Sequence, residues 1–554
     1  MVRVDIWLAG WRPYLLLGGL CLCLYLPGMR AIPVLDRDEA RFAQATRQML
    51  ETGDFLNIRF QDEARNKKPA GIYWLQAAAV SAFSTPESTA IWPYRLPSLI
   101  GATLAVLFLF GFGRELLRGL TEEAAAARMA LLTAVLLATA LGTVAEAHIA
   151  KTDAALLAAI VAGQGALGLC YLHARGGRDL GIGITVTFWL AQIVAIYLKG
   201  PVEPALAIAT AATLSIADRN WRWLRGVRPI AGLAATAVAI GPWLVAIQRA
   251  TGGEFLAGSL GHDFLSKIGG AQESHGAPPL YYLALSLVTF WPGSLYLAPA
   301  LIHGWHRHEQ PVVRFLLAWI VPAWVVLELV PTKLPNYALP LYPALALLAA
   351  GALVEGRRSG EPRWERWVNT AVAALWALTT LLIAGATIVL PIRFGGVVGI
   401  VVTGIVSAAL IVLLAALLYR RAGNAALLAA LTLVFVVPAA GRVVPHLARL
   451  WLSRDAADMV VREPGFGGVP LTVIGYNEPS LVFLLGGRVR FTMPDVAATL
   501  ADGAEALVND RQAPMFAQEL APRGLVARPL DSVHGIDYSN GQWTRLTLYR
   551  IEPK

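Results

Sequence analysis

The sequence predicts an α-helical polytopic membrane protein, with amphipathic helices beside the membrane and a soluble α/β domain at its C-terminal end. The chain has 554 residues, of which 56% are hydrophobic and 15% are charged. Soluble globular proteins carry about 25% charged residues, so this composition indicates an integral membrane protein. Apolar runs recur as far as residue 441, and the pattern changes after it. We therefore expect a transmembrane catalytic domain over 1–441 and a soluble domain over 442–554.

The first apolar run, at about 14–29, follows Arg3 and Arg12, as in the charged start and apolar centre of a signal peptide. We interpret it as a transmembrane helix that begins in the cytoplasm, because no small-residue cleavage site follows and many more runs come later. Each later run is close to the roughly twenty residues that cross a bilayer, which makes about thirteen helices in all. The later runs lie at about 98–117, 128–146, 153–173, 181–198, 201–217, 229–248, 281–302, 312–330, 336–355, 368–391, 396–418 and 424–441.

Arginine is concentrated in alternate loops, which predicts the orientation of the chain. The positive-inside rule places the arginine-rich loops in the cytoplasm. The first loop, 30–97, and the tail then lie on the opposite side of the membrane. The arginines are Arg114, Arg118, Arg128, Arg175, Arg178, Arg219, Arg222, Arg225, Arg228, Arg307, Arg357, Arg358, Arg363, Arg366, Arg420 and Arg421.

A charged stretch at 36–42 organises this first external loop. Asp36, followed three residues later by Glu39, predicts a capping box and therefore a helix start. Gly53 suits the C-terminal end of that helix. A helix with one apolar face lies along a bilayer surface rather than crossing it. The apolar face consists of Phe42, Ala45, Thr46 and Met49.

A second interfacial helix is expected after Lys67-Lys68-Pro69, where the proline suits a first helical turn. The segment 71–75, which contains Tyr73 and Trp74, begins this helix. The two lysines are therefore expected between two helices that lie beside the membrane.

The tail after about residue 441 replaces the long apolar runs by shorter patterns. Segments 469–475, 481–485, 489–491 and 544–551 resemble strands, and helical patterns occupy 494–500 and 514–520. This alternation predicts a small α/β domain. The tail contains no nucleophile elbow, phosphate loop or metal-spaced cluster, so we interpret it as accessory.

Ionisable side chains gather on the external side, at helix ends and in loops. Charges at membrane depth are costly and therefore indicate functional sites. Taken singly, Lys199 or Lys333 fits a snorkelling topology anchor better, and the charges around Asp38 fit a solvated, self-paired cluster. We favour one shared site because the clusters lie on one side of the membrane. They are Asp38, Glu39 and Arg41; Lys67 and Lys68; Glu146, His148, Lys151 and Asp153; and Lys199, His262 with Lys267, His275, and Lys333 with Tyr337.

Such a site suits the transfer of a group from a lipid phosphate. Lysine and arginine would hold the phosphate and stabilise the charge it gains on leaving, and a carboxylate would orient the acceptor or take its proton. The sequence has no Walker motif or nucleotide fingerprint, which argues against an ATP-driven transporter. No basic tract with interleaved aromatic residues indicates a nucleic-acid partner. Cys21, Cys23 and Cys170 lie in apolar runs, so neither disulfides nor a zinc site is indicated.

At these residues the chain resembles the membrane glycosyltransferases of GT-C type that use polyprenyl-phosphate sugars, close to the protein O-mannosyltransferases. Within them it is most similar to the aminoarabinose transferases of lipid A. The similar pieces occur in the same order over about residues 30–345. They are Asp38-Glu39-Ala40-Arg41-Phe42-Ala43, Lys68-Pro69 with Tyr73-Trp74, Lys151-Thr152-Asp153, Lys199-Gly200, Gly241-Pro242-Trp243, His262, His275-Gly276-Ala277-Pro278 with Tyr281-Tyr282, and Lys333-Leu334-Pro335-Asn336-Tyr337.

The resemblance implies an essential acid in the first external loop, at Asp38, and a donor phosphate held by Lys68 and Arg41. Members of the family often carry an acidic residue before the Lys-Pro pair, where this chain has Lys67, so a role for that acid is not carried over. Asp38 with His262 is a candidate pair of ligands for a divalent ion, although no cofactor is required. The candidate catalytic residues are Asp38, Asp153 and Lys68, and the candidate substrate-binding residues are Glu39, Arg41, Lys67, Tyr73, Lys151, Lys199, His262, His275, Lys333 and Tyr337.

The implied reaction moves 4-amino-4-deoxy-L-arabinose from undecaprenyl phosphate to a phosphate of lipid A, a modification linked to resistance to cationic peptides. The resemblance implies a monomer in the bacterial inner membrane, with its active site and tail in the periplasm. One alternative keeps the scaffold but transfers another sugar, such as mannose, to a protein hydroxyl, which would require a true base. Another is a lipid transporter or flippase, although transporters carry internal repeats that this sequence lacks. A structural scaffold would not need charges that converge at lipid depth.

Overall fold

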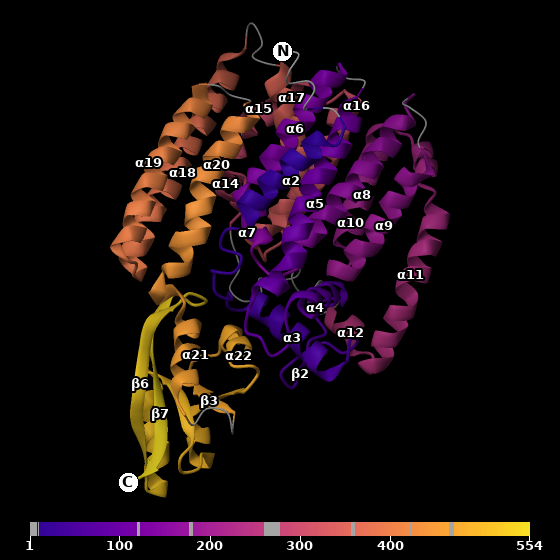
Figure 1. The fold of residues 1–554 in the computed structure, drawn as a ribbon. Coiled ribbons are helices and arrows are strands. Elements are labelled where there is room, and N and C mark those ends of the chain that lie inside the picture. The colour runs from indigo at the N-terminus through magenta and orange to yellow at the C-terminus, as the bar shows by residue number, and fades with distance from the viewer. Residues whose placement is uncertain are drawn as a thin grey trace.

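The computed structural model describes Leu8 and residues 10–118, 122–176, 181–259, 278–355, 361–420, 424–464 and 470–554. Figure 1 shows a bundle of long helices with a small sheet domain at one end. The helices α3 and α4 lie at the same end of the bundle as this domain, and the C-terminus lies beyond them.

Each predicted apolar run contains a helix, but not every run is a full span. Among the described residues, nine helices are long and apolar enough to cross a membrane, or ten if the bent pair α6 and α7 counts as one. The expected count of about thirteen is too high on this criterion, because α2 and α10 are short and the run at 281–302 is broken. The bundle elements are α2 (Arg12–Tyr25), α5 (Trp92–Leu117), α6 (Glu123–Thr139), α7 (Leu141–Ala147), α8 (Asp153–His173), α9 (Ile182–Lys199), α10 (Val202–Ala217), η1 (Arg222–Val227), α11 (Pro229–Ala250), α12 (Glu254–Leu256), α14 (Tyr281–Thr289), η3 (Gly293–Tyr296), α15 (Leu297–His306), α16 (Pro311–Leu329), η4 (Pro335–Leu341), α17 (Tyr342–Glu355), α18 (Arg363–Phe394), α19 (Val398–Arg420), α20 (Ala425–Pro438), η5 (Ala439–Val443), η6 (Val444–His446) and η7 (Ala448–Leu450).

Helix α8 lies in the interior of the bundle because most of its residues are small and apolar. Nearly all of them are buried, and α8 packs against both α5 and α9. A Cβ atom at Gly101 of α5 would lie 2.5 Å from the Cα of Ala155, so glycine is required for this close approach. The first residue of α8 is Asp153, which places a carboxylate at the positive end of a buried helix dipole.

The two helices expected beside the membrane are α3 (Asp38–Thr52) and α4 (Gly71–Phe83), with the short antiparallel strands β1 (Arg59–Phe60) and β2 (Glu63–Ala64) between them. Helix α3 ends at Gly53, whose φ of 70° suits glycine. The predicted apolar face of α3 is buried inside the protein, where it packs against α4. The side chains that meet there are Phe42, Ala45, Met49 and Tyr73.

The predicted capping box does not form at the start of α3. Arg37 precedes the first turn with a φ of 62°, and no side chain caps the helix. The Glu39 carboxylate pairs with Arg95, whereas the Asp36 carboxylate accepts a hydrogen bond from the hydroxyl of Ser480 in the tail. Both carboxylates have partners across the fold. The local backbone N–H that Glu39 does accept from is that of Leu35, at 2.8 Å, and not that of Asp36, which a capping box would use.

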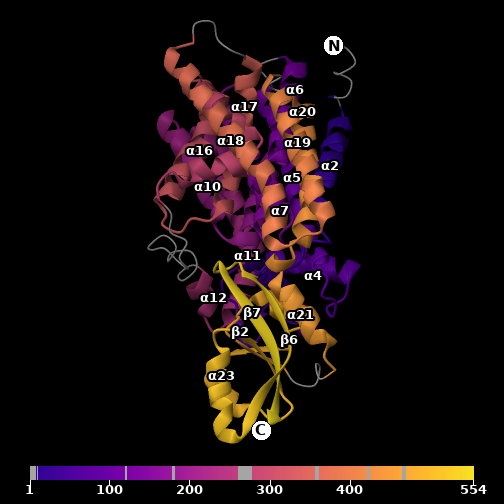
Figure 2. The same ribbon diagram turned by 90° about the vertical axis from the view of Figure 1, so that its left-hand side faces the viewer.

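The tail forms the expected α/β domain around a five-stranded sheet in the order β4-β3-β5-β7-β6. Figure 2 shows the long strands β6 and β7 of this sheet, with α21 and α23 beside them. Strand β3 runs parallel to β4 and β5, and β7 runs antiparallel to β5 and β6. The strand expected at 481–485 is wrong, because Pro479 begins a short helix there whose apolar residues are buried. The elements are α21 (Leu452–Arg462), β3 (Leu471–Ile474), α22 (Pro479–Leu484), β4 (Val489–Thr492), η8 (Pro494–Thr499), β5 (Glu505–Asn509), α23 (Ala513–Leu520), η9 (Ala521–Arg523), β6 (Leu525–Asp537) and β7 (Gln542–Pro553).

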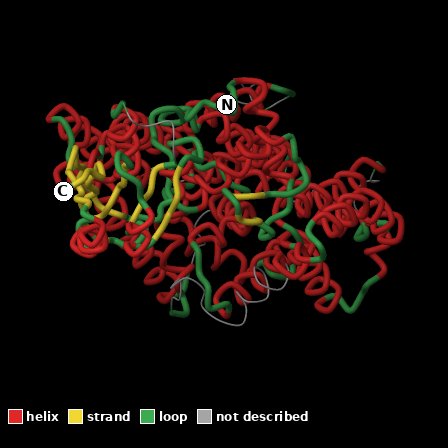
Figure 3. Tube along the Cα trace, turned by 90° about the horizontal axis from the view of Figure 1, so that it is seen from below, coloured by secondary structure: helices red, strands yellow, loops and turns green. Residues whose placement is uncertain are grey.

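The tail domain is joined to the bundle through α3. Arg47, which is 1% exposed, donates hydrogen bonds to the carbonyl oxygens of Phe483 at 2.7 Å, Pro86 at 2.6 Å and Ser88 at 2.6 Å. One arginine thus connects α3, the tail and the segment before α5. Seen from below, the sheet covers only one side of the helical bundle (Figure 3).

Candidate active site

A polar cluster centred on Asp153 joins three segments that are distant in sequence. The Nζ of Lys199, at the end of α9, lies 2.6 Å from Asp153 Oδ1. The Nδ2 of Asn336, in η4, donates to the same oxygen at 2.7 Å. Gly200 follows Lys199 directly and ends α9 with a φ of 74°, a conformation that other residues rarely adopt. We call Asp153, Lys199, Asn336, Lys151 and Glu146 the Asp153 node.

Lys151 joins this node from the loop between α7 and α8. Its Nζ lies 2.9 Å from Glu146 Oε1 and 3.8 Å from Asp153 Oδ2. Burial disfavours the charged form of Lys151, but the carboxylates of Glu146, Asp153 and Asp38 outweigh burial and raise the pKa of Lys151. The effect of Asp38 places the start of α3 within electrostatic reach of the node, while Asp38 itself remains exposed.

A cavity of about 350 Å³ opens beside the Asp153 node. Apolar side chains of α8, α10 and α16 form its interior, and the loop before α4 adds two lysines to its mouth. Lys199 also lies 5.5 Å from the ring centre of Tyr337, within the range of a cation–π contact. A cationic mouth above an apolar interior suits a phosphate attached to a hydrocarbon chain. The polar residues that line the cavity are Lys67, Lys68, Asp153, Lys199, Ser259, Asn336 and Tyr337.

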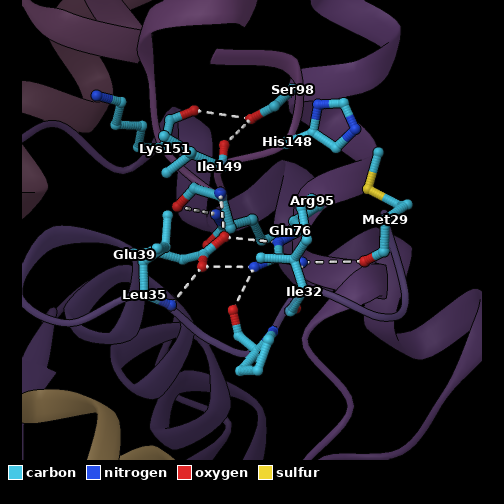
Figure 4. A network of polar contacts seen from close by, with 12 residues as sticks. Met29, Ile32, Leu35, Glu39, Gln76, Arg95, Ser98, His148, Ile149 and Lys151 are labelled. Atoms are coloured by element: carbon cyan, nitrogen blue, oxygen red, sulfur yellow. Dashed lines mark hydrogen bonds and ion pairs between the residues drawn. The ribbon is translucent and has the colours of Figure 1, made fainter. Parts of the chain in front are cut away.

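Glu39 forms a closed ion pair with Arg95 and does not line this cavity (Figure 4). Both side chains are fully buried, and Nε and Nη2 of Arg95 each lie 2.8 Å from a Glu39 oxygen. Backbone groups satisfy the rest of both side chains. The geometry therefore gives Glu39 a positioning role in place of the predicted contact with substrate, because it ties the start of α3 to the loop that carries Lys151. These backbone groups belong to Met29, Ile32, Pro33, Leu35 and Ala150.

Five other predicted site residues also lie away from the cavity lining: Asp38, Lys151, Tyr73, Lys333 and Arg41. The hydroxyl of Tyr73 is buried and accepts a hydrogen bond from Nε of Arg65 at 3.0 Å. Lys333 donates to the backbone oxygen of Glu328 at 2.6 Å and lies 3.4 Å from its carboxylate. Arg41 is half-buried on α3, on the side that faces the tail domain.

The predicted histidine contributions, His262 and His275, fall outside the described residues. Of the two candidate metal ligands, Asp38 and His262, the structure therefore describes only Asp38. Within the described ranges, no three or more His, Cys, Asp or Glu side chains are grouped so that they could hold a metal ion.

Sequence reasoning did not assign three residues that the structure makes prominent. Glu146 and Asn336 lie in the quoted clusters and motifs but had no stated role. Arg95 was missed because the predicted span began at 98. An arginine four residues into a long apolar helix was the available signal, since a charge there needs a buried partner.

The chain is similar in sequence to the undecaprenyl phosphate-alpha-4-amino-4-deoxy-L-arabinose arabinosyl transferases. The protein from Pseudomonas aeruginosa (strain UCBPP-PA14) is 28% identical over 324 residues, which cover 58% of this chain and 56% of the relative. The protein from Enterobacter sp. (strain 638) is 25% identical over 365 residues, covering 65% and 63%. The match thus spans little more than half of the length of these relatives. No family model matches the chain.

The fold is similar to that of solved structures of ArnT and of an oligosaccharyltransferase. The crystal structure of ArnT from Cupriavidus metallidurans bound to undecaprenyl phosphate superposes with a TM-score of 0.73 and 19% identity, covering 98% of each chain. The Archaeoglobus fulgidus oligosaccharyltransferase gives a TM-score of 0.52 at 11% identity, covering 96% of this chain and 72% of that one. The resemblance to aminoarabinose transferases and the polytopic fold expected from the sequence are therefore confirmed.

Proposed function

We propose that this chain is a glycosyltransferase that moves 4-amino-4-deoxy-L-arabinose from undecaprenyl phosphate to a phosphate of lipid A. The observation that carries the proposal is the Asp153 node, which places Lys199 at the mouth of an apolar cavity. The names of the sequence relatives support the same sugar and the same lipid carrier.

In the proposed reaction, an oxygen of the lipid A phosphate attacks the anomeric carbon of the sugar. The bond between that carbon and the donor phosphate oxygen breaks, and its electron pair leaves with undecaprenyl phosphate. The leaving phosphate gains a negative charge, which Lys199 and Lys68 stabilise at the cavity mouth. Because an ammonium group has three N–H donors, Lys199 can bind this phosphate while it keeps its contact with Asp153.

The carboxylates of the site then act mainly by positioning other side chains and the substrates. The acceptor phosphate is already an anionic nucleophile, so no strong base is required. Asp153 orients Lys199 and Asn336, each through a short contact with one oxygen. The exposed Asp38 orients the acceptor or binds the amino group of the sugar, and Lys151 links Asp38 electrostatically to the node.

The protein is a multi-pass membrane protein, and we place it in the bacterial inner membrane with the node facing the periplasm. The tail domain and α3 lie at one end of the bundle (Figure 1), and hydrogen bonds join them. The arginine-rich loops of the sequence predict that the opposite end faces the cytoplasm. The proposed partners are the lipid-linked sugar and lipid A, and the periplasmic leaflet holds both lipids.

A reconstituted transfer assay tests the proposal. The full chain in lipid vesicles, supplied with undecaprenyl phosphate-aminoarabinose and lipid A, is expected to yield aminoarabinose-modified lipid A by mass spectrometry. Lys199→Ala should abolish most of this product and weaken the binding of undecaprenyl phosphate. The wild-type chain could instead bind the carrier through Lys199 but modify a protein hydroxyl. That result would support the proposed donor site and contradict lipid A as the acceptor.

A further inference from the structure

A second cavity, of about 570 Å³, lies on the other side of α8 from the first. Leu156 and Leu157 line the first cavity, whereas Ala155, Ala158 and Ala162 line the second. The spacing of these alanines places them on one helical face. Helices α4, α5 and α9 form the other walls, and no ionisable side chain is among the described lining residues.

The second cavity is a groove that opens to the outside of the bundle. Ile100 of α5 and Leu190 of α9 line it and are 52% and 54% exposed. A hydrocarbon chain could therefore enter from the bilayer between α5 and α9. Small side chains on α4 and α8 leave the room for it, including Ala78, Ala82 and Ala159.

The dimensions of the groove match one leaflet of a bilayer. Along α5 it extends from Leu96 to Phe108, about 18 Å of helix at 1.5 Å per residue. The hydrocarbon core of a bilayer is about 30 Å thick, so one leaflet is about 15 Å. The groove therefore accommodates a chain from the leaflet at whose surface the Asp153 node lies.

Charged groups lie on both sides of the groove at its end nearest the Asp153 node. Ala155 and Leu198 line it, and they lie close in sequence to Asp153 and Lys199 of the node. On the other side, the Phe83 ring packs against Trp92, and the exposed Arg30 guanidinium lies 4.6 Å from the centre of the Trp92 ring. An apolar groove with cations beside the end nearest the node suits an anionic lipid of the same leaflet.

We propose that this groove binds an acyl chain of the acceptor lipid A. The inference rests on the proposed function and adds the place of the acceptor. The donor chain then occupies the first cavity, the acceptor chain occupies the groove, and α8 separates the two lipids. Since α8 begins at Asp153, both phosphate headgroups meet at the same node, and Arg30 binds a second anionic group of the acceptor.

Photolabelling of the full chain in nanodiscs tests this placement. The probe is lipid A with a diazirine on one acyl chain, and mass spectrometry locates the labelled peptides. In the wild type, labelling is expected on α4, α5, α8 or α9 at the groove. The labelling yield should decrease in the variants Ala78→Trp and Val194→Trp, whose new side chains fill the groove from two walls. Ala234→Trp, on the exposed face of α11, is the matched control and should label as the wild type does.

Kinetics give the second arm of the test. Ala78→Trp should raise the KM for lipid A about tenfold, by displacing a few buried methylenes, and leave undecaprenyl phosphate binding unchanged. An unchanged KM for lipid A in both filled variants would overturn the inference. Equal labelling by a diazirine phosphatidylglycerol or by a polyprenyl phosphate probe would also overturn it. Labelling needs no turnover, so the groove assignment is tested even if the wild type transfers no aminoarabinose.

Discussion

Two buried ion pairs lie close together at the end of the bundle that faces the tail, and they differ in what surrounds them. The Glu39–Arg95 pair is fully enclosed, and backbone groups on both sides satisfy its remaining donors and acceptors. The Asp153–Lys199 pair is equally short but lines a cavity. A buried charge pair that is saturated by its own protein has no capacity left for a ligand.

This difference assigns separate roles to residues from one charged stretch. Asp38 and Glu39 are neighbours in sequence, yet Asp38 is exposed near the node and Glu39 is 1% exposed within the closed pair. Burying charge is costly, and that cost applies both to the Glu39–Arg95 pair and to the Asp153 node. Only the Asp153 node combines that cost with open space and cationic donors.

Removal of one partner from the closed pair should have the largest effect on folding. Glu39→Ala leaves the Arg95 guanidinium buried without its carboxylate, and we expect a loss of about 3–5 kcal/mol in the free energy of unfolding. Thermal unfolding of the purified chain in detergent measures this loss. A Glu39→Ala variant as stable as the wild type would show that the pair is not the structural connection described above.

Asp153→Asn should instead affect activity more than folding. The amide keeps the size of the side chain but removes the negative charge that orients Lys199, so transfer should fall on the order of 100-fold. The fall should appear in kcat with a much smaller change in Tm. Should Asp153→Asn unfold the chain while transfer per folded molecule is preserved, the two ion pairs would be equivalent and the comparison would fail.

Lys68→Ala is expected to weaken the donor site about tenfold, because one cation at the cavity mouth contributes a charge-assisted contact with the phosphate. The readout is the KM for the undecaprenyl phosphate-linked sugar. Lys67→Ala is the matched control, since Lys67 also lines the cavity but is exposed and more strongly solvated. Equal effects of both substitutions would indicate a general field of positive charge instead of a defined contact.

The smallest expected effect concerns the contact between α3 and the tail. Burial and then the nearby Glu478 carboxylate hold the pKa of Asp36 well above 3.8, and burial likewise raises that of Glu478 above 4.5. The folded state therefore retains protons that the unfolded state releases, so the stability that these two carboxyl groups contribute is fully present below about pH 4 and is lost as pH rises through their raised pKa values. Asp537, Tyr476, Tyr538, Arg37 and Arg41 also face these two carboxyl groups.

Asp36→Asn removes one of these titrating groups. The Tm of the wild type should fall more steeply between pH 4 and pH 8 than the Tm of the variant. Parallel curves for the two proteins would contradict the assignment of this pH dependence to Asp36.

Much of the fold followed from local patterns. Apolar runs located the helices, and the spacing of Phe42 and Met49 located the buried face of α3. The strand expected at 481–485 failed because a short apolar segment is compatible with a strand or a buried helix, and its docking against α3 decided between them. Within the described residues, the count of full spans was too high because hydropathy reports neither the short length of α2 and α10 nor breaks such as the one after Thr289.

The sequence by itself determined that this is a helical membrane protein, and it predicted a charged site on one side of the membrane together with candidate residues for its charges. These properties are local, since hydropathy and helical spacing are set over a few turns. Tertiary structure alone decided which charges pair and which line a cavity. Glu39 lies 56 positions from Arg95, and Asp153 lies 183 positions from Asn336. The strength of each contact depends on distance and desolvation in space, so only the packing of α3, α5, α8 and α9 could separate the closed pair from the open node.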